Sequence, residues 1–218
     1  MIYKTIQLTN TQPLSSLLVT SALVKEGKTT LAIGLALSAA RSHQRVLLID
    51  ANFRNPSLHQ YLGLLNIQGL STQLHPALSR WNQTKISPVS LSYAGASIDV
   101  MLTGAVPDDP MKLLSSHQMQ QVLDRAEASY DLVIVDAPAI SGLADGLQLA
   151  SLCKASVLVS RLDRITQGDL DHAMAMLSQV NTIGVVANWH RESSRTERLY
   201  DRNGAAKVSR EPEMIWRN

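Results

Sequence analysis

Short runs rich in Val, Leu and Ile recur along the chain and alternate with stretches in which apolar residues follow a helical spacing. Each run is apolar at consecutive positions, as in strands that are buried on both faces of a parallel sheet. The runs cover residues 16–20, 45–49, 98–102, 132–135 and 156–160, with 183–187 as a sixth. The helical stretches cover residues 29–42, 116–128 and 167–180. This alternation predicts an α/β fold, a doubly wound and mostly parallel sheet with helices on both faces.

Two parts of the chain lack this alternation. Residues 64–96 are polar, contain two prolines and show no clear period, which predicts a loop-rich excursion over the surface. The last residues are polar with few apolar positions, which is typical of a disordered extension. The chain thus divides into an N-terminal remnant or arm, one core domain and a tail. Their expected residues are 1–14, 15–190 and 191–218.

Composition and charge exclude several classes of protein. With 45% apolar residues among 218, the chain can bury one core. Residues 1–189 carry thirteen basic and thirteen acidic side chains, so the small basic excess lies in the tail, which argues against nucleic acid binding. No run approaches the ~20 apolar residues of a membrane span, so any membrane association must come through a partner. The single cysteine, Cys153, fits the reducing cytosol, where we expect the protein.

The first chemical motif lies between the first predicted strand and the first long helix. In a phosphate loop, backbone N–H groups and a helix N-terminus surround the phosphates. Gly27 allows close approach, Lys28 reaches the β and γ oxygens, and Thr29 offers its hydroxyl to magnesium. The pattern G-x-x-x-x-G-K-S/T requires glycine where this chain has Ala22, so the strand–loop–helix context carries the interpretation. The alternative is a chance Gly-Lys-Thr at the start of a surface helix.

These positions predict a site for ATP with Mg²⁺. The expected cofactor contacts are Lys25, Glu26, Gly27, Lys28, Thr29 and Thr30. Thr30 is placed to reach the α-phosphate. Asn188, just past the last predicted strand, is a candidate to read the adenine edge, although a turn asparagine is the simpler interpretation of its position.

Two predicted strands end in an aspartate. Asp50 follows the second strand and Asp136 follows the run Val133-Ile134-Val135, and ligands of α/β sheets bind beyond the carboxyl ends of strands. A buried acid after an apolar strand is costly without a cation, so Asp136 is interpreted as the Walker B residue that supports the magnesium water. For Asp50 the alternative is an ordinary turn aspartate. The predicted metal site is Thr29, Asp50 and Asp136, and the predicted catalytic residues are Lys28, Asp50 and Asp136.

Several motifs in order resemble one family, the bacterial tyrosine kinases of capsular and exopolysaccharide export. The resemblance covers roughly residues 15–190. It is carried by Leu17-Leu18-Val19-Thr20-Ser21, Gly27-Lys28-Thr29-Thr30, Val46-Leu47-Leu48-Ile49-Asp50-Ala51, Arg54-Asn55-Pro56-Ser57-Leu58-His59, Leu62-Gly63-Leu64, Gly104, Pro107, Pro110, Leu113-Leu114-Ser115-Ser116, Tyr130 to Pro138 and Asp145. This combination is far more specific than any one motif.

The resemblance implies a P-loop ATP site with two Walker-type acidic strands, related to the partitioning and septum-placement ATPases. It implies transfer of the γ-phosphoryl group to tyrosines of a C-terminal cluster, often between subunits of a homo-oligomeric ring. The implied partner is a membrane chain-length regulator of polysaccharide export. By position, Lys28 and Thr29 would hold phosphate and magnesium, Asp50 would assist the attacking hydroxyl, and Asp136 would hold magnesium.

The chain departs from the family pattern in four places. Asn52 replaces the second acid of Asp-x-Asp, so an uncharged amide stands where a carboxylate is usual. Lys25 replaces a loop glycine, which costs ~1 to 2 kcal/mol if that position requires a positive φ. The tail holds one tyrosine, Tyr200, instead of a cluster. The ring motif Glu-x-x-Arg-x-x-Arg is not matched. Its positions are occupied by Met1, Lys4 and Gln7.

Three hypotheses follow from these residues. The protein is an ATP-dependent tyrosine kinase, a nucleotide-dependent switch that hydrolyses ATP slowly, or a pseudokinase scaffold in an export complex. Family membership favours the first, whereas Asn52 and the single tail tyrosine favour the other two. We expect ATP binding in every case.

Overall fold

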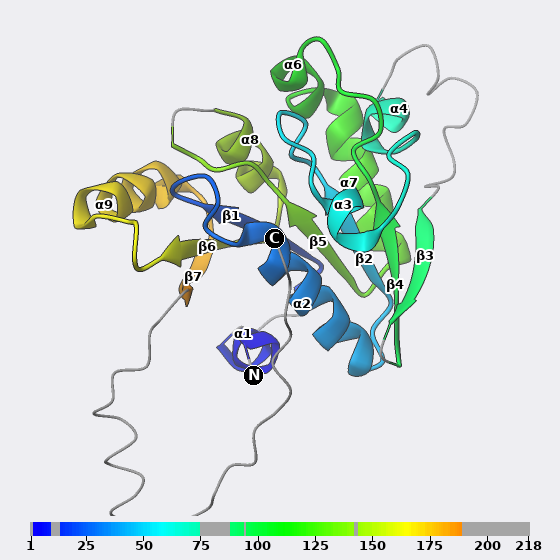
Figure 1. The fold of residues 1–218 in the computed structure, drawn as a ribbon, viewed down its shortest axis with the longest axis horizontal. Coiled ribbons are helices and arrows are strands. Elements are labelled where there is room, and N and C mark those ends of the chain that lie inside the picture. The colour runs from blue at the N-terminus through cyan, green and yellow to red at the C-terminus, as the bar shows by residue number, and fades with distance from the viewer. Residues whose placement is uncertain (1, 10–13, 75–87, 94, 142–143, 189–218) are drawn as a thin grey trace, which may run out of the picture.

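A computed structural model describes residues 2–9, 14–74, 88–93, 95–141 and 144–188 of the chain (Figure 1). A seven-stranded sheet forms its centre, with the strand order β3-β4-β2-β5-β1-β6-β7. All neighbouring strands are parallel except β3 and β4. The strands are β1 (Ser16–Ser21), β2 (Val46–Asp50), β3 (Val89–Tyr93), β4 (Ala96–Met101), β5 (Leu132–Asp136), β6 (Ala155–Arg161) and β7 (Thr182–Asn188).

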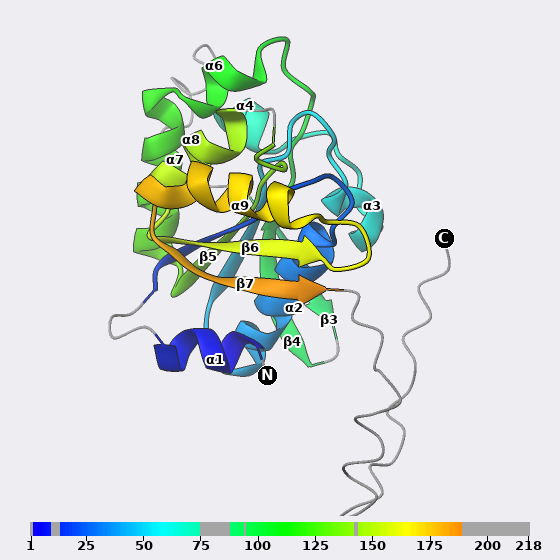
Figure 2. The same ribbon diagram turned by 90° about the vertical axis from the view of Figure 1, so that its left-hand side faces the viewer.

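Helices cover both faces of the sheet, as Figure 2 shows. On one face, α1 and α2 contribute buried residues to a core cluster with the strands. On the other face, α7, α8 and α9 contribute to a second cluster. The helices are α1 (Ile2–Thr9), α2 (Lys28–Arg41), α3 (Leu58–Leu62), α4 (Leu70–Leu74), α6 (Pro110–Leu114), α7 (His117–Ser129), α8 (Ala144–Leu152) and α9 (Gln167–Met176), followed by the 3₁₀ turn η1 (Leu177–Gln179).

The predicted α/β fold is therefore confirmed. Each of the six apolar runs lies in a strand to within one residue at either end of the run, and the central strands β1, β2 and β5 are buried at every position. The three predicted helical stretches form α2, α7 and α9 with η1. Because consecutive apolar residues fill both sides of a doubly covered strand, the pattern was sufficient to locate them.

The surface excursion predicted for residues 64–96 is wrong for part of that stretch. Leu70 and Leu74 of α4 are fully buried in the core beneath α7. The N–H of Leu70 donates to the carbonyl of Leu102 at 2.8 Å, which fixes α4 beside the end of β4. Residues 89–93 form the antiparallel edge strand β3. Residues 75–87 lie outside the described part of the chain.

Residues 2–9, expected to belong to an arm, form the helix α1. Tyr3 and Ile6 are buried in the cluster that α2 covers, and the Tyr3 hydroxyl donates to the side chain of Gln44. The division into residues 1–14, 15–190 and 191–218 stays a prediction, and the tail with Tyr200 lies outside the described residues. Within the described part, no helix combines the length and apolar character needed to cross a membrane.

The strand order determines where a ligand can bind. The chain passes from β1 to β2 and later places β5 between them. The carboxyl ends of these three strands therefore meet at one edge, at the kind of crossover where α/β sheets bind ligands. The loop to α2, Asp50 and Asp136 all follow from this edge.

Candidate nucleotide and metal site

The loop between β1 and α2 has the conformation that a phosphate loop requires. Gly27 precedes α2 with φ 94°, and Lys25 also lies in the left-handed region with φ 62°. A Cβ atom at Gly27 would lie 2.2 Å from Nδ2 of Asn188, so a larger residue does not fit there. Because Lys25 has a positive φ, the conformational cost predicted for a replaced glycine applies to this residue. The side chain of Lys25 is exposed at the tip of the loop.

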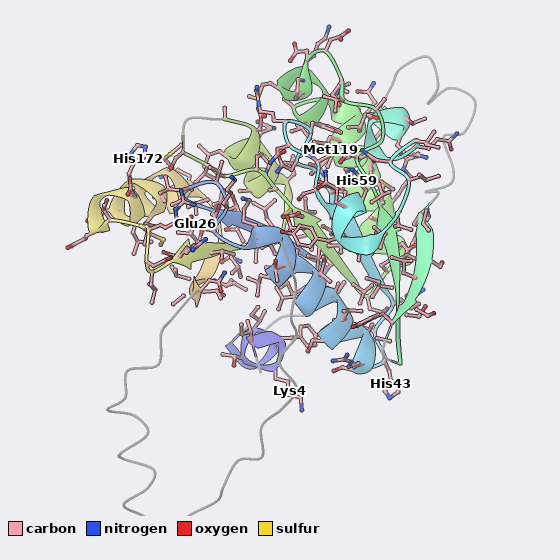
Figure 3. All side chains as sticks on the ribbon, viewed as in Figure 1. Lys4, Glu26, His43, His59, Met119 and His172 are labelled. Carbon is pink, nitrogen blue, oxygen red and sulfur yellow. The ribbon has the colours of Figure 1, made fainter. Side chains whose placement is uncertain are left out.

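Glu26 holds this loop against the neighbouring strands (Figure 3). Its side chain is 1% exposed, and its two carboxylate oxygens accept the N–H of Leu23 at 2.7 Å and the N–H of Arg161 at 3.0 Å. Nδ2 of Asn188 donates to the Glu26 carbonyl at 2.9 Å. Any contact of Glu26 with phosphate would therefore come from its backbone N–H, because the carboxylate is used inside the protein.

Asn188 is the last residue of β7, not a turn residue, and its amide nitrogen supports the loop. Its predicted contact with adenine stays a prediction, as do the contacts of Lys25, Glu26 and Thr30 with phosphate. The carboxylate of Glu26 was missed by sequence reasoning. An acid inside a phosphate loop was the available signal, since it would repel phosphate unless its charge were held elsewhere.

Thr29 and Asp136 meet directly, although they lie on α2 and at the end of β5. The Thr29 hydroxyl donates to Oδ2 of Asp136 at 2.6 Å. Oδ1 of Asp136 is buried and has no hydrogen-bond partner among the described residues. The pKa of Asp136 is raised to about 7, mainly by burial; the hydrogen bond from Thr29 and the charge of Lys28 act to lower it, and the charge of Asp50 acts to raise it. A buried carboxylate with an unpartnered oxygen is costly without a cation.

Lys28 directly precedes Thr29 in the sequence, and its charge acts on the Asp136 carboxylate. It is only 8% exposed. Burial lowers the pKa of its ammonium group, while the charges of Asp136 and Glu26 act in the opposite direction. An ammonium held in the interior beside two carboxylates gains a further partner when a phosphate binds.

Asp50 is in register with Asp136 on the neighbouring strand. It is fully buried, and its Oδ1 and Oδ2 accept the N–H groups of Asn52 and Leu58, both at 3.1 Å. Burial raises the pKa of Asp50, and these backbone hydrogen bonds lower it. The structure thus brings the two predicted acids together, but the oxygens of Asp50 are used by its own loop.

The loop after β2 carries the residue that departs from the family pattern. Oδ1 of Asn52 accepts the N–H of Asn55 at 3.3 Å, so the amide oxygen closes a turn within the loop. The Ser57 hydroxyl lies 3.2 Å from the hydroxyl of Thr29. Residue 57 therefore contacts the predicted metal-binding residue, whereas the side-chain oxygen of residue 52 faces its own loop.

An ion pair joins the loop after β2 to the region after β5. Nε of Arg54 lies 2.6 Å from Oδ2 of Asp145 at the start of α8. The Asp145 side chain is 2% exposed and that of Arg54 is 43% exposed. Because these loops flank the two acids, the pair fixes their relative position. The sequence placed both residues in motifs but did not indicate that they meet.

The donor set fits a divalent cation with a nucleotide. Mg²⁺ prefers hard oxygen ligands and keeps several waters, and the site offers a hydroxyl beside an unpartnered carboxylate oxygen. Lys28 and the turn through Gly27 at the N-terminus of α2 fit phosphate. Within the described residues there is no cluster of three or more His, Cys, Asp and Glu side chains placed to hold a metal by themselves, so phosphate and water would complete the shell.

Comparison with known proteins agrees with this geometry. The profile of a ParA family, described as NUBPL iron-transfer P-loop NTPase, matches residues 15–215. Tyrosine-protein kinase YwqD of Bacillus subtilis (strain 168) is 32% identical over 189 residues, which cover 86% of this chain and 77% of that protein. Tyrosine-protein kinase etk of Escherichia coli (strain K12) is 33% identical over 174 residues, but these cover only 23% of its length.

Solved structures give the same answer for the fold. The kinase domain of Escherichia coli tyrosine kinase ETK superposes with a TM-score of 0.75 at 31% identity, covering 87% of this chain and 72% of that domain. The septum site-determining protein MinD of Pyrococcus horikoshii, solved with Mg-ADP, shares the fold with a TM-score of 0.61 at 18% identity, over 83% of this chain and 72% of that one. The chain therefore belongs to the bacterial tyrosine kinase family, within the ParA-like P-loop NTPases.

Proposed function

We propose that the protein binds ATP with Mg²⁺ and transfers the γ-phosphoryl group to tyrosine hydroxyls, in the control of polysaccharide polymerisation and export. The observation that carries this proposal is the contact between Thr29 and Asp136 beside the buried Lys28. Its hydroxyl, carboxylate and ammonium are the groups that phosphoryl transfer requires around the β and γ phosphates. The kinase names of the relatives supply the acceptor class.

Each residue has a separate task in this proposal. The backbone of the loop and Lys28 hold the phosphates, while Thr29 and Asp136 would hold Mg²⁺, Asp136 through a water. Bound Mg²⁺ supplies charge neutralisation at the transferred phosphoryl group. Asp50 would orient the acceptor hydroxyl, and the N–H groups of Asn52 and Leu58, one on each of its oxygens, would hold the carboxylate in place.

The expected surroundings follow from the family. The chain spans 23% of the length of Etk, so the partner and the pathway are proposals drawn from resemblance. We propose a membrane chain-length regulator of polysaccharide export as the partner and a location at the cytoplasmic side of the membrane. Self-association is a further part of the proposal, although the ring motif is missing at residues 1, 4 and 7.

One observation favours a second function, a nucleotide-dependent switch without tyrosine kinase activity. Asp50 is buried and each of its oxygens accepts a backbone N–H, while Oδ1 of Asn52 is used within the loop. Residues 51–57, which follow β2, contain no acid to assist an acceptor hydroxyl. Such a site still binds nucleotide and metal, and it would change the loop with nucleotide state.

A single experiment separates these functions. The purified protein is incubated with Mg²⁺ and γ-labelled ATP, with and without a tyrosine-containing peptide, and both free phosphate and label on tyrosine are measured. Label on tyrosine supports the kinase, and release of phosphate without label supports the switch. Lys28→Ala is the control. Its free energy of nucleotide binding should be weaker by about 2–5 kcal/mol, as expected when one partner of a buried charge pair is removed. Wild-type affinity in this variant would overturn the P-loop assignment.

A further inference from the structure

Ser57 stands at the N-cap of α3 but does not cap that helix. A serine at this position ordinarily accepts a backbone N–H of the first helical turn. Here the side chain makes no cap hydrogen bond, and Asp50 accepts the N–H of Leu58 instead. The Ser57 hydroxyl contacts Thr29 across 28 positions of the sequence. The Ser57 hydroxyl thus contacts the nucleotide site instead of capping its own helix, which suggests a role for this hydroxyl in that site.

The hydrogen bonds give this contact a direction. A threonine hydroxyl has one proton, and Thr29 donates it to Asp136. In the 3.2 Å contact Ser57 is therefore the donor and Thr29 the acceptor. The Ser57 proton thus faces one of the two lone pairs of the Thr29 oxygen. A cation that took the place of this proton would lie beside both oxygens, because they are 3.2 Å apart.

The spacing of the two oxygens fits neighbouring ligands of one magnesium ion. Octahedral Mg²⁺ binds oxygens at about 2.0–2.1 Å, so two adjacent ligands lie about 2.9 Å apart. The Thr29 and Ser57 hydroxyl oxygens are 3.2 Å apart. One further observation indicates a cation here independently of this spacing. Among the described residues, Oδ1 of Asp136 is buried without a hydrogen-bond partner.

We propose that Ser57 is a second hydroxyl ligand of the divalent cation, beside Thr29. This inference rests on the proposed function, since it concerns the metal that accompanies the nucleotide. It also makes the loop after β2 responsive to the metal. Cation binding exchanges the bond between Ser57 and Thr29 for bonds to one ion, and the N–H of the next residue, Leu58, is bound to Asp50.

Mn²⁺ provides a direct test, because the electron paramagnetic resonance of the free ion reports binding without any turnover. The protein is saturated with ADP and titrated with Mn²⁺. Ser57→Ala should weaken Mn²⁺ binding about ten- to a hundredfold, the usual range for residues that position a metal. Its affinity for ADP in EDTA should stay within about twofold of wild type, because Ser57 makes no expected contact with nucleotide.

Three comparisons decide the outcome. Ser57→Thr, which keeps the hydroxyl, should restore Mn²⁺ binding, and Asn55→Ala in the same loop should bind Mn²⁺ as the wild type does. Wild-type affinity in Ser57→Ala, or no rescue by Ser57→Thr, would overturn the role of Ser57 while leaving ATP binding and phosphoryl transfer intact. A wild-type protein that binds neither ADP nor Mn²⁺ would overturn the proposed function and this inference together.

Discussion

Asp50 and Asp136 end neighbouring strands at the same level of the sheet, yet their carboxylates have different surroundings. Asp50 gives both oxygens to backbone N–H groups of the loop that follows it. One oxygen of Asp136 accepts the Thr29 hydroxyl, and the other has no partner among the described residues. The first carboxylate is satisfied by the protein, whereas the second keeps an oxygen that is available to a cation. Position in the sheet thus places an acid, and the adjoining loop determines what it can do.

The pH dependence of the free energy of unfolding should give the largest effect with which to test this comparison of the two carboxylates. The pKa of Asp136 is raised from 3.8 to about 7 in the folded protein. Between these values the folded state keeps a proton that the unfolded state has released, so the free energy of unfolding falls as pH rises. Between pH 4.5 and pH 7.5 the loss should be about 3 kcal/mol for this group. Denaturant titrations in EDTA at pH 4.5 and pH 7.5 should show a smaller loss in Asp136→Asn.

Asp50→Asn provides a matched control for that measurement. The pKa of Asp50 is also raised, so ionisation of Asp50 likewise lowers the free energy of unfolding as pH rises. This pH dependence remains in the Asp136→Asn variant. If the free energy of unfolding of Asp136→Asn varied with pH as that of the wild type does, the pKa of Asp136 would not be raised in the metal-free protein.

Truncation of each acid to alanine should sharpen the comparison in the metal-free protein. Asp50→Ala leaves the buried N–H of Leu58 and the partly buried N–H of Asn52 without an acceptor, which should cost about 2–4 kcal/mol of unfolding free energy. Asp136→Ala removes a poorly satisfied carboxylate and should change it by less than about 1 kcal/mol. Equilibrium denaturation at pH 7.5 measures both. Equal losses would mean that the two carboxylates have equivalent surroundings.

Restoring an acid at residue 52 tests whether the loop after β2 limits chemistry. Asn52→Asp should raise phosphoryl transfer or ATP hydrolysis by about a hundredfold, at the lower end of what a positioned acid–base group contributes. Its remaining oxygen can still accept the N–H of Asn55, so the turn should survive. Asn55→Asp adds the same charge to the same loop and should not raise the rate. Equal rates of phosphoryl transfer and ATP hydrolysis in the wild type, Asn52→Asp and Asn55→Asp would show that Asn52 does not limit the chemistry.

The smallest expected effect concerns the tip of the phosphate loop. Lys25→Gly relieves a left-handed residue and should stabilise the protein by about 1 kcal/mol. His43 has φ 64° in the turn after α2, so His43→Gly is a matched control with a similar expected gain. Only the change at Lys25 should alter ATP affinity, because it removes a cation at the loop tip. An identical ATP affinity in both variants would exclude a contact between Lys25 and phosphate.

The sequence predicted the parts of the site that follow from strand position. The apolar runs located β1, β2 and β5, and the residues after them were the phosphate loop, Asp50 and Asp136. The roles of Glu26, Ser57 and the pair Arg54–Asp145 did not follow, because they depend on loop conformations without a period. Two positive φ values shape the phosphate loop, and nothing in the pattern specifies which backbone N–H each carboxylate meets.

The missed elements α4 and β3 have a related cause. α4 contributes two buried leucines, too few to produce a helical period over five residues. β3 is an edge strand with mostly exposed residues, so it lacks the apolar run that identified the other strands. Both are held by neighbours distant in sequence, α4 at the end of β4 and β3 along it.

The place of β5 between β1 and β2 has a consequence for biosynthesis. A ribosome produces β1 and β2 first, and neither contacts the other in the finished sheet. The phosphate loop and Asp50 can be joined only after residues 132–136 have left the exit tunnel and entered the gap. A nascent chain that stops before residue 132 should therefore be unable to retain nucleotide. Nucleotide capture would then mark the moment at which the centre of the sheet closes.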